Sequence, residues 1–298
     1  MPSPAVRPLL PLLALAVLSL IWGYTWVLAK QGLDFAPPFA FAAARSAGGA
    51  ASLLAVLLIM RKPLRPQAPW PTFGIGLTQV TGFLALQTWA LVEGGPGKTA
   101  VLIFTMPIWT LILSRIFLGE RLRLGQWLAA LCTLGGLLLI IEPWELHTSP
   151  WSKLLGVAAA LCWALGTVQV KHLRSRQAVD LFALTAWQLA IGCVPLVVLA
   201  LLLPERATNW TWHYAAILGF MAIVSTGFCW WLWIWILDRV PAWEASLSIL
   251  GTPVVAIASS RLLLGEAFHA AEMAGIALIG GGLALLSLLG WLAGRRAD

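Results

Sequence analysis

Long apolar stretches separated by short polar segments make up most of this chain. A helix needs about 20 apolar residues to cross a bilayer, and the short alternating segments of a transmembrane barrel do not occur. The pattern predicts an all-α, polytopic membrane protein. The first stretch is too long for the apolar part of a signal peptide, so it is interpreted as a helix. We expect ten transmembrane helices, at residues 9–29, 38–60, 73–93, 96–118, 124–142, 152–172, 180–203, 213–237, 241–264 and 269–291.

Prolines mark both the starts and the middles of these helices. Pro38, Pro96 and Pro241 lie in the first turn of the second, fourth and ninth helices, where a missing N–H group costs nothing. Pro107 and Pro253 lie within the fourth and ninth helices. A proline inside a helix removes one backbone hydrogen bond, so we predict a kink at each of these two positions.

The second half of the chain repeats the first, with an offset that drifts only from 141 to 146 residues. The matched positions include Trp22 and Trp163, Lys30 and Lys171, Gly49 and Gly192, Thr81-Gly82-Phe83 and Thr226-Gly227-Phe228, Pro107 and Pro253, Ser114-Arg115 and Ser260-Arg261, and Gly135-Gly136 and Gly281-Gly282. We therefore assign residues 1–148 to a first repeat and residues 149–298 to a second. Each repeat holds five helices, and five is an odd number, so the two repeats are inverted in the membrane. Inverted repeats are typical of secondary transporters that bind substrate near the bilayer midplane.

Composition and charge fit a membrane protein. Of the 298 residues 60% are hydrophobic and 10% are charged, whereas about 25% are charged in a typical soluble protein. The four cysteines lie in apolar stretches, which favours buried thiols over disulfides or metal ligands. The net charge of +7 comes from short groups between the helices and does not indicate nucleic-acid binding. Thirteen of the nineteen lysines and arginines fall on the inner side when the N-terminus is cytoplasmic, so we expect both termini in the cytoplasm.

The opening of each repeat resembles a known family. Residues 21–49, with Trp22-Gly23, Lys30, Pro37-Pro38 and Arg45, are similar to the first repeat of EamA-type transporters in the drug/metabolite transporter superfamily. The segment Ser260–Glu266 and the glycine-rich final helix are similar to the second. The resemblance covers the whole chain and implies a ten-helix transporter, with the YddG-type exporters of aromatic and other amino acids as the nearest type. The second repeat departs from the pattern, since Ala164 and Gln188 stand where the first has Gly23 and Arg45.

The third and eighth helices supply the first candidate substrate-binding residues. Gly82 and Phe83 lie near the middle of the third helix, and Thr226 and Gly227 lie near the middle of the eighth. Glycine permits close approach of a ligand, but small residues are also common where membrane helices pack. The amides of Gln79 and Gln87 need partners inside the bundle, and with Phe83 they share one face at four-residue spacing. They are candidates for binding a substrate, with packing between helices as the alternative.

Deep tryptophans and one arginine complete the candidate site. Trp22, Trp109, Trp163 and Trp230 lie away from the membrane interfaces and suit an aromatic or cationic substrate, with bulky packing as the alternative. In the eighth helix Trp230 and Trp233 share one face, while Trp231 and Trp235 share another, so at most one pair lines a cavity. Arg45 is the ionisable residue placed well inside a helix. It pairs with a substrate carboxylate or reaches the outer interface.

These patterns predict a secondary transporter that exports amino acids or related small metabolites across the bacterial inner membrane. The sequence has no phosphate-binding loop, no metal-ligand spacing and no nucleophile motif, so we expect no cofactor, no metal and no catalysis. The expected partners are a small-molecule substrate and membrane lipid, and we expect a monomer. All acidic residues lie in loops or near helix ends, which favours facilitated transport. The alternatives are a proton-coupled exporter of drugs or other metabolites, and an intramembrane enzyme or sensor.

Overall fold

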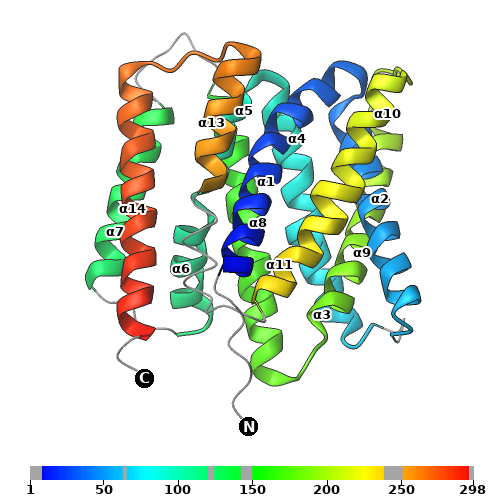
Figure 1. Ribbon diagram of the computed structural model, residues 1–298, viewed down its shortest axis with the longest axis horizontal. Coiled ribbons are helices and arrows are strands. Elements are labelled where there is room, and N and C mark those ends of the chain that lie inside the picture. Colours follow the sequence, from blue (N-terminus) through cyan, green and yellow to red (C-terminus); the bar gives the residue numbers. More distant parts are fainter. Residues whose placement is uncertain (1–8, 63–65, 120–123, 142–149, 238–250, 295–298) are drawn as a thin grey trace.

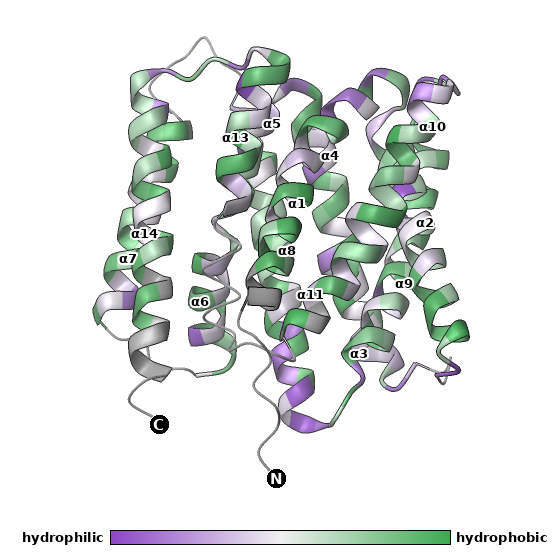
Figure 2. Cartoon of the chain, viewed as in Figure 1, coloured by the Kyte–Doolittle hydropathy of each residue, from purple (hydrophilic) through white to green (hydrophobic). Residues whose placement is uncertain are grey.

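The computed structural model describes residues 9–62, 66–119, 124–141, 150–237 and 251–294, and every regular element in these ranges is helical. Seven helical spans in these ranges are long and apolar enough to cross a membrane, and three shorter apolar helices accompany them. Hydrophobic residues cover the helices along their length, and most hydrophilic residues gather near the helix ends (Figure 2). The predicted all-α membrane fold is confirmed.

The first repeat folds into five helical units, two of which are made of shorter pieces. The third unit is helical without interruption through its three pieces, whereas the fourth is divided by a turn at Phe104 and Thr105. The elements are α1 (Leu9–Phe35), α2 (Pro38–Ile59), α3 (Pro69–Ile75), η1 (Gly76–Gly82), α4 (Phe83–Glu93), α5 (Pro96–Ile103), α6 (Met106–Phe117) and α7 (Leu124–Ile141).

The second repeat has the same order of units. Its third unit is again built from three pieces, and its fourth unit is described only from residue 251 onward. The elements are α8 (Trp151–Arg176), α9 (Leu181–Leu202), α10 (Trp212–Gly219), η2 (Phe220–Phe228), α11 (Cys229–Leu237), α13 (Gly251–Leu264) and α14 (Ala270–Gly294). In Figure 1 α1 begins and α14 ends at the same end of the bundle.

Several predicted boundaries need correction. The first helix extends to Phe35 rather than residue 29, and the third unit begins at Pro69 rather than residue 73. Pro107 lies in the first turn of α6 rather than inside a continuous helix, because the chain already turns at Phe104 and Thr105. Pro253 lies in the first described turn of α13, so the kink predicted for it, like the helix start at Pro241, falls on residues outside the described ranges.

Both third units contain a π-helical segment at the same place, η1 in the first repeat and η2 in the second. A π turn is a rare element that is often found at functional sites. In each segment a threonine hydroxyl donates to the carbonyl five residues earlier: Thr81 to Gly76 at 3.5 Å, and Thr226 to Met221 at 2.8 Å. The repeated sequence Thr-Gly-Phe thus coincides with a repeated departure from α-helical geometry.

Each π segment packs against the second helix of the opposite repeat. A side chain at Gly192 in α9 would place its Cβ 2.6 Å from the carbonyl oxygen of Gly76 in η1, so the two backbones are in contact there. The matched residue of α2, Gly49, likewise lies against Thr226 of η2. The repeats therefore interlock through two equivalent glycine contacts.

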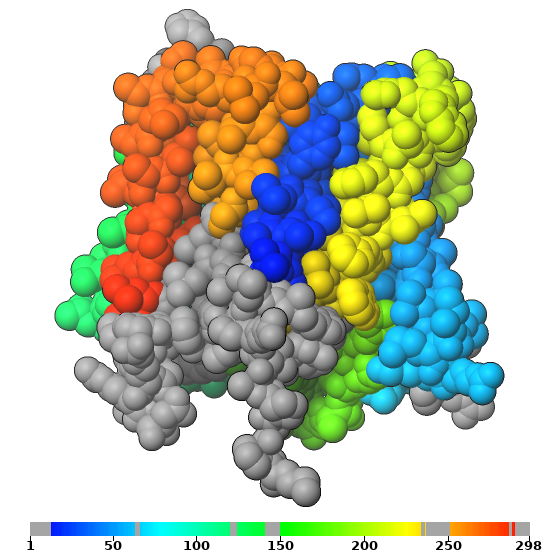
Figure 3. All heavy atoms as spheres, in the orientation of Figure 1, coloured from blue at the N-terminus to red at the C-terminus, as the bar shows by residue number. Residues whose placement is uncertain are grey.

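The last helices of the two repeats, α7 and α14, pack side by side at the edge of the bundle (Figure 1). A Cβ atom at Gly136 would lie 2.6 Å from the carbonyl oxygen of Gly275, and one at Gly282 would lie 2.8 Å from that of Ala129. Elsewhere α1 lies between α13 and the α10–α11 unit on the face drawn in Figure 3. The inverted repeats are thus in contact along several helix pairs.

Carboxylates of the second repeat bind the helix starts of the first. Glu205 accepts from the backbone N–H groups of Phe39 (3.0 Å) and Ala40 (3.1 Å) at the start of α2. Glu266 accepts from Gly97 (2.8 Å) and Lys98 (3.1 Å) at the start of α5. Helix N-termini carry free donors and a partial positive charge, so each carboxylate stabilises a contact between the repeats.

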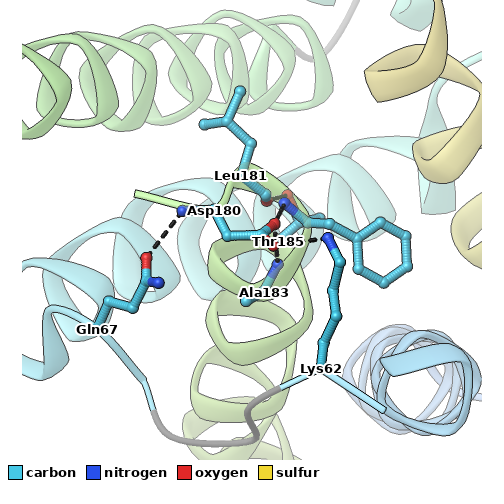
Figure 4. A network of polar contacts seen from close by, with 7 residues as sticks. Lys62, Gln67, Asp180, Leu181, Ala183 and Thr185 are labelled. Carbon is cyan, nitrogen blue, oxygen red and sulfur yellow. Dashed lines mark hydrogen bonds and ion pairs between the residues drawn. The ribbon is translucent and has the colours of Figure 1, made fainter. Parts of the chain in front are cut away.

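Asp180 joins α2, α9 and the segment before α3 at the opposite end of the bundle. Its Oδ1 atom accepts from the N–H groups of Phe182 (2.9 Å) and Ala183 (3.2 Å), which makes it the N-cap of α9. Its Oδ2 atom lies 2.7 Å from Nζ of Lys62, and its N–H group donates to Oε1 of Gln67 at 2.8 Å (Figure 4). Partial burial acts to raise the pKa of this carboxyl, but the hydrogen bonds and the Lys62 charge outweigh it and hold the pKa below the usual value.

Asp180→Ala is expected to lower the free energy of unfolding by about 1 kcal/mol, because it removes an N-cap. Asp180→Asn should cost less at neutral pH, since asparagine also caps helices. The pKa of Asp180 is lowered in the folded state, so the stabilisation by its charge is present above the carboxyl's usual pKa and is lost as pH falls through the folded-state pKa. Thermal unfolding in detergent at several pH values measures this. A difference between wild type and Asp180→Asn that grew on acidification would contradict it.

Candidate central binding site

A cavity of about 100 Å³ lies among the middles of helices from both repeats. Because a single water needs about 10–15 Å³ on this scale, the cavity has room for several waters or a small solute. Its lining is mostly apolar and aromatic, with a few polar groups, which is typical of small-molecule sites. The described residues that line it are Trp22, Thr25, Trp26, Arg45, Gln79, Val80, Phe83, Leu84, Gln87, Ile103, Phe104, Met106, Trp163, Gln188, Leu189, Ser225, Thr226 and Trp230.

A chain of aromatic contacts forms one wall of the cavity. The ring of Trp163 lies 4.8 Å from Phe83 and 5.5 Å from Trp230, measured between centroids, and Trp230 lies 6.3 Å from Trp22. These rings come from α8, α4, α11 and α1, so the wall crosses between the repeats. Edge-to-face and tilted contacts of this kind position each ring, and they leave π faces that attract cations and other rings.

Polar contacts in the cavity follow the pseudo-symmetry of the repeats. The Nε atom of Arg45 in α2 donates to Oγ1 of Thr226 in η2 at 3.4 Å. At the matched position of α9, Gln188 donates from Nε2 to Oε1 of Gln79 in η1 at 3.4 Å. Each second helix therefore reaches the π segment of the opposite repeat from an equivalent position. A movement of either π segment would change the cavity lining directly.

Two polar atoms at the cavity lack partners. Among the residues that the structure describes, the buried Nη1 atom of Arg45 and the buried Oε1 atom of Gln87 have no hydrogen bond. No carboxylate belongs to the described lining of the cavity, and the two described ion pairs, Lys62–Asp180 and Lys98–Glu272, lie at helix ends. Buried groups of this kind are costly unless something pairs with them. Two side chains that line the cavity, Arg45 and Gln87, therefore each carry one polar atom that no described residue pairs, a cationic donor and a neutral acceptor.

Eight of the eleven residues predicted from the sequence line this cavity. They come from both repeats, and they include both glutamines of the third helix and the predicted arginine. The eight are Trp22, Arg45, Gln79, Phe83, Gln87, Trp163, Thr226 and Trp230. Of the tryptophans in α11, Trp230 lines the cavity and Trp233 contacts Trp22, whereas Trp231 is 38% exposed, in line with the predicted division into two faces. The side chain of Trp235 lies outside the described set.

The other three predicted residues lie away from the cavity. A Cβ atom at Gly82 would lie 3.0 Å from Sγ of Cys162 in α8, so this glycine serves close helix packing. Gly227 likewise packs against Ser52 of α2. Trp109 donates from Nε1 to Oγ1 of Thr105 at 3.1 Å and packs in a separate apolar cluster, because the turn at residues 104–105 directs Phe104 and Met106 to the cavity instead.

Sequence reasoning missed several lining residues, and some of these carried a signal. Gln188 occupies the position that matches Arg45, so the repeat alone pointed to it. Trp26 lies one helical turn beyond Trp22 on the same face. Ser225 accepts the Thr25 hydroxyl at 3.0 Å, and its carbonyl accepts Nε1 of Trp22 at 3.0 Å. Nothing in the sequence indicated Thr25 and Ser225, because their contact depends on how α1 packs against η2.

Comparison with known proteins gives the chain a family context. The profile of the EamA-like transporter family matches residues 9–142 and 150–288. The "Uncharacterized transporter YoaV" of Bacillus subtilis (strain 168) is 32% identical over 266 residues, which cover 86% of this chain and 89% of that protein. The "Probable amino-acid metabolite efflux pump" of Escherichia coli (strain K12) is 32% identical over 285 residues, covering 91% of this chain and 92% of that protein.

A further relative and a solved structure are also similar to this chain over nearly its whole length. The "Probable amino-acid metabolite efflux pump" of Salmonella typhimurium (strain LT2) is 30% identical over 299 residues and covers 96% of both chains. One solved crystal structure superposes with a TM-score of 0.67 at 22% identity, covering 97% of this chain and 98% of that chain. This last likeness concerns the fold alone.

Proposed function

The chain belongs to the EamA-like transporter family and is a membrane transporter, and we propose that it exports amino acids or related small metabolites from the bacterial cytoplasm. The observation that carries this proposal is the central cavity, which both repeats line with aromatic rings and neutral amides. The names of the Escherichia coli and Salmonella relatives, each a probable amino-acid metabolite efflux pump, support the same substrate class.

Alternating access suits this arrangement. Substrate sites of transporters with inverted repeats lie near the bilayer midplane, and the repeats move against each other around them. Here the two π segments and the turn at Phe104 and Thr105 contribute residues to the cavity lining and interrupt regular α-helical hydrogen bonding. We propose these as the places where the helices bend, while the glycine contacts between α7 and α14 are kept.

Transport is proposed to be driven by the substrate gradient, without obligatory proton exchange. Proton-coupled carriers place a titratable group within the membrane, but the described cavity lining contains no aspartate, glutamate or histidine. Glu205 and Glu266, described acids near span ends, are engaged with helix starts instead. Glu244, which the sequence places in the first turn of the ninth predicted helix, lies outside the described ranges.

The test is counterflow in liposomes that contain the purified protein and a high internal concentration of unlabelled amino acids. Labelled amino acids supplied outside should accumulate transiently, and liposomes without protein should show no such uptake. A second arm imposes a gradient of about two pH units with no substrate gradient, which would suffice for about 100-fold accumulation if one proton moved per substrate.

We expect counterflow for a subset of amino acids and no accumulation driven by the pH gradient. Absence of counterflow for all twenty amino acids, with normally folded protein, would contradict amino-acid transport. Uphill accumulation that a protonophore abolished would instead establish the proton-coupled alternative.

A further inference from the structure

We propose that the cavity recognises the α-amino-acid group itself, with the substrate carboxylate on Arg45 and the substrate ammonium at the side-chain oxygen of Gln87. The inference rests on the transport function proposed above and adds a mode of recognition to it. The unpartnered atoms of these two residues are opposite in character, since one is a cationic donor and the other a neutral acceptor.

Arg45 requires an anion in the cavity. Its guanidinium group presents five donors, of which Nε reaches Thr226 at 3.4 Å while the buried Nη1 atom has no partner among the described residues. No carboxylate belongs to the described lining of the cavity, so none of the described residues supplies a counter-charge there. Carboxylate is the group that a guanidinium binds best, through two parallel hydrogen bonds. A substrate carboxylate would therefore pair a charge that no described residue pairs.

Gln87 requires a donor in the same cavity. Gln87 is 4% exposed, and its Oε1 atom has no hydrogen bond with any described residue. Gln79, one of the other glutamines of the cavity, already pairs its Oε1 atom with Gln188. Of the three glutamines that line the cavity, Gln87 is the one with a buried side-chain oxygen that no described residue pairs. An ammonium group provides three donors, and the nearby aromatic faces attract the same cation.

A zwitterion satisfies both groups, whereas a simple acid or a simple amine satisfies only one. When a carboxylic acid without the amino group binds, the side-chain oxygen of Gln87 stays buried without a donor. When an amine without the carboxylate binds, the guanidinium group of Arg45 stays buried without an anion. The ring chain of Phe83, Trp163 and Trp230 would receive an apolar or aromatic substrate side chain. The cavity therefore favours α-amino acids over their decarboxylated and deaminated analogues.

The experiment measures displacement of labelled L-phenylalanine from the purified full-length protein by three compounds that share one ring. They are unlabelled L-phenylalanine, phenethylamine, which lacks the carboxylate, and 3-phenylpropionate, which lacks the ammonium. In the wild type we expect each analogue to displace at least tenfold more weakly than L-phenylalanine, and phenethylamine about 100-fold more weakly.

Two variants should change this selectivity in opposite directions. Arg45→Gln installs the residue found at the matched position 188. It should weaken the binding of L-phenylalanine about 100-fold, so that phenethylamine binds with similar affinity. Gln87→Leu should weaken the binding of L-phenylalanine about tenfold, so that 3-phenylpropionate binds with similar affinity. Arg115→Gln, which removes an exposed arginine of α6, is the matched control and should bind as wild type does. Thermal midpoints establish that each variant is folded, and Arg45→Lys, which keeps the charge, should still reject phenethylamine.

The outcomes separate this inference from the proposed function. If Arg45→Gln weakens all three compounds equally, or still rejects phenethylamine, Arg45 is a structural residue and the inference is wrong while amino-acid transport can stand. The same holds if amino acids undergo counterflow but L-phenylalanine does not bind. If no amino acid undergoes counterflow, the proposed function fails as well.

Discussion

Gly136→Leu is expected to lower the free energy of unfolding by about 3 kcal/mol, the largest loss of stability that we predict for a single substitution in this protein. Even a Cβ atom at this position would lie 2.6 Å from the carbonyl oxygen of Gly275 and 2.8 Å from Cγ1 of Ile279. Both atoms belong to α14, and the oxygen is part of its backbone, so α7 and α14 must separate to admit a larger side chain. Thermal or denaturant-induced unfolding in detergent measures the loss.

The neighbouring glycine provides a matched control. A Cβ atom at Gly135 would meet nothing within 4 Å, and leucine favours helices by nearly 1 kcal/mol relative to glycine. Gly135→Leu should therefore leave the stability unchanged or raise it slightly. Equal effects of the two substitutions would mean that the contact between α7 and α14 does not limit the stability of the fold.

Trp230→Ala is expected to weaken substrate binding about 30-fold, the largest effect on affinity that we predict for an aromatic residue. Trp230 contacts both Trp163 and Trp22, so its removal deletes part of the cavity wall and frees its neighbours to move. Stacking and burial of this kind contribute about 2 kcal/mol, which corresponds to that change in affinity. Equilibrium binding of the amino acid with the strongest counterflow measures it.

The adjacent tryptophan distinguishes the cavity wall from the general bulk of α11. Trp231 is 38% exposed and contacts Phe228, which is 42% exposed, on the face turned away from the cavity. Trp231→Ala should change affinity less than twofold, and Trp230→Phe should recover most of the binding lost in Trp230→Ala. Similar losses for Trp230→Ala and Trp231→Ala would indicate an indirect effect through the helix.

Much of the fold could be predicted because the bilayer imposes simple rules on sequence. Apolar length marks each crossing, and a five-helix repeat has to invert when it is duplicated. Pro107 predicted a kink in the fourth unit, and the structure has a turn just before it, at Phe104 and Thr105. The π segments gave no such signal, because residues 76–82 and 220–228 contain nothing that excludes an ordinary α-helix.

Sequence reasoning could identify residues of the candidate site where polar chemistry restricts the surroundings that a side chain can occupy. It could not do so where helix packing alone determines what a residue contacts. Gln79, Gln87 and Arg45 have to find polar surroundings in a membrane, and all three line the cavity. Gly82 and Gly227 are compatible with a ligand or with a neighbouring helix, and only the positions of Cys162 and Ser52 decide between them. A sequence does not contain those positions.

The shared place of the two π segments bears on how the chain arose. A π turn holds one residue more than the α-helical turn it replaces, and here the surplus occurs in the third unit of both halves, at the same Thr-Gly-Phe sequence. One insertion in an ancestral half-length gene accounts for both segments, whereas insertion after duplication would require the same event twice. A single insertion before duplication is therefore the simpler account of the two segments, because it needs one event where the alternative needs two.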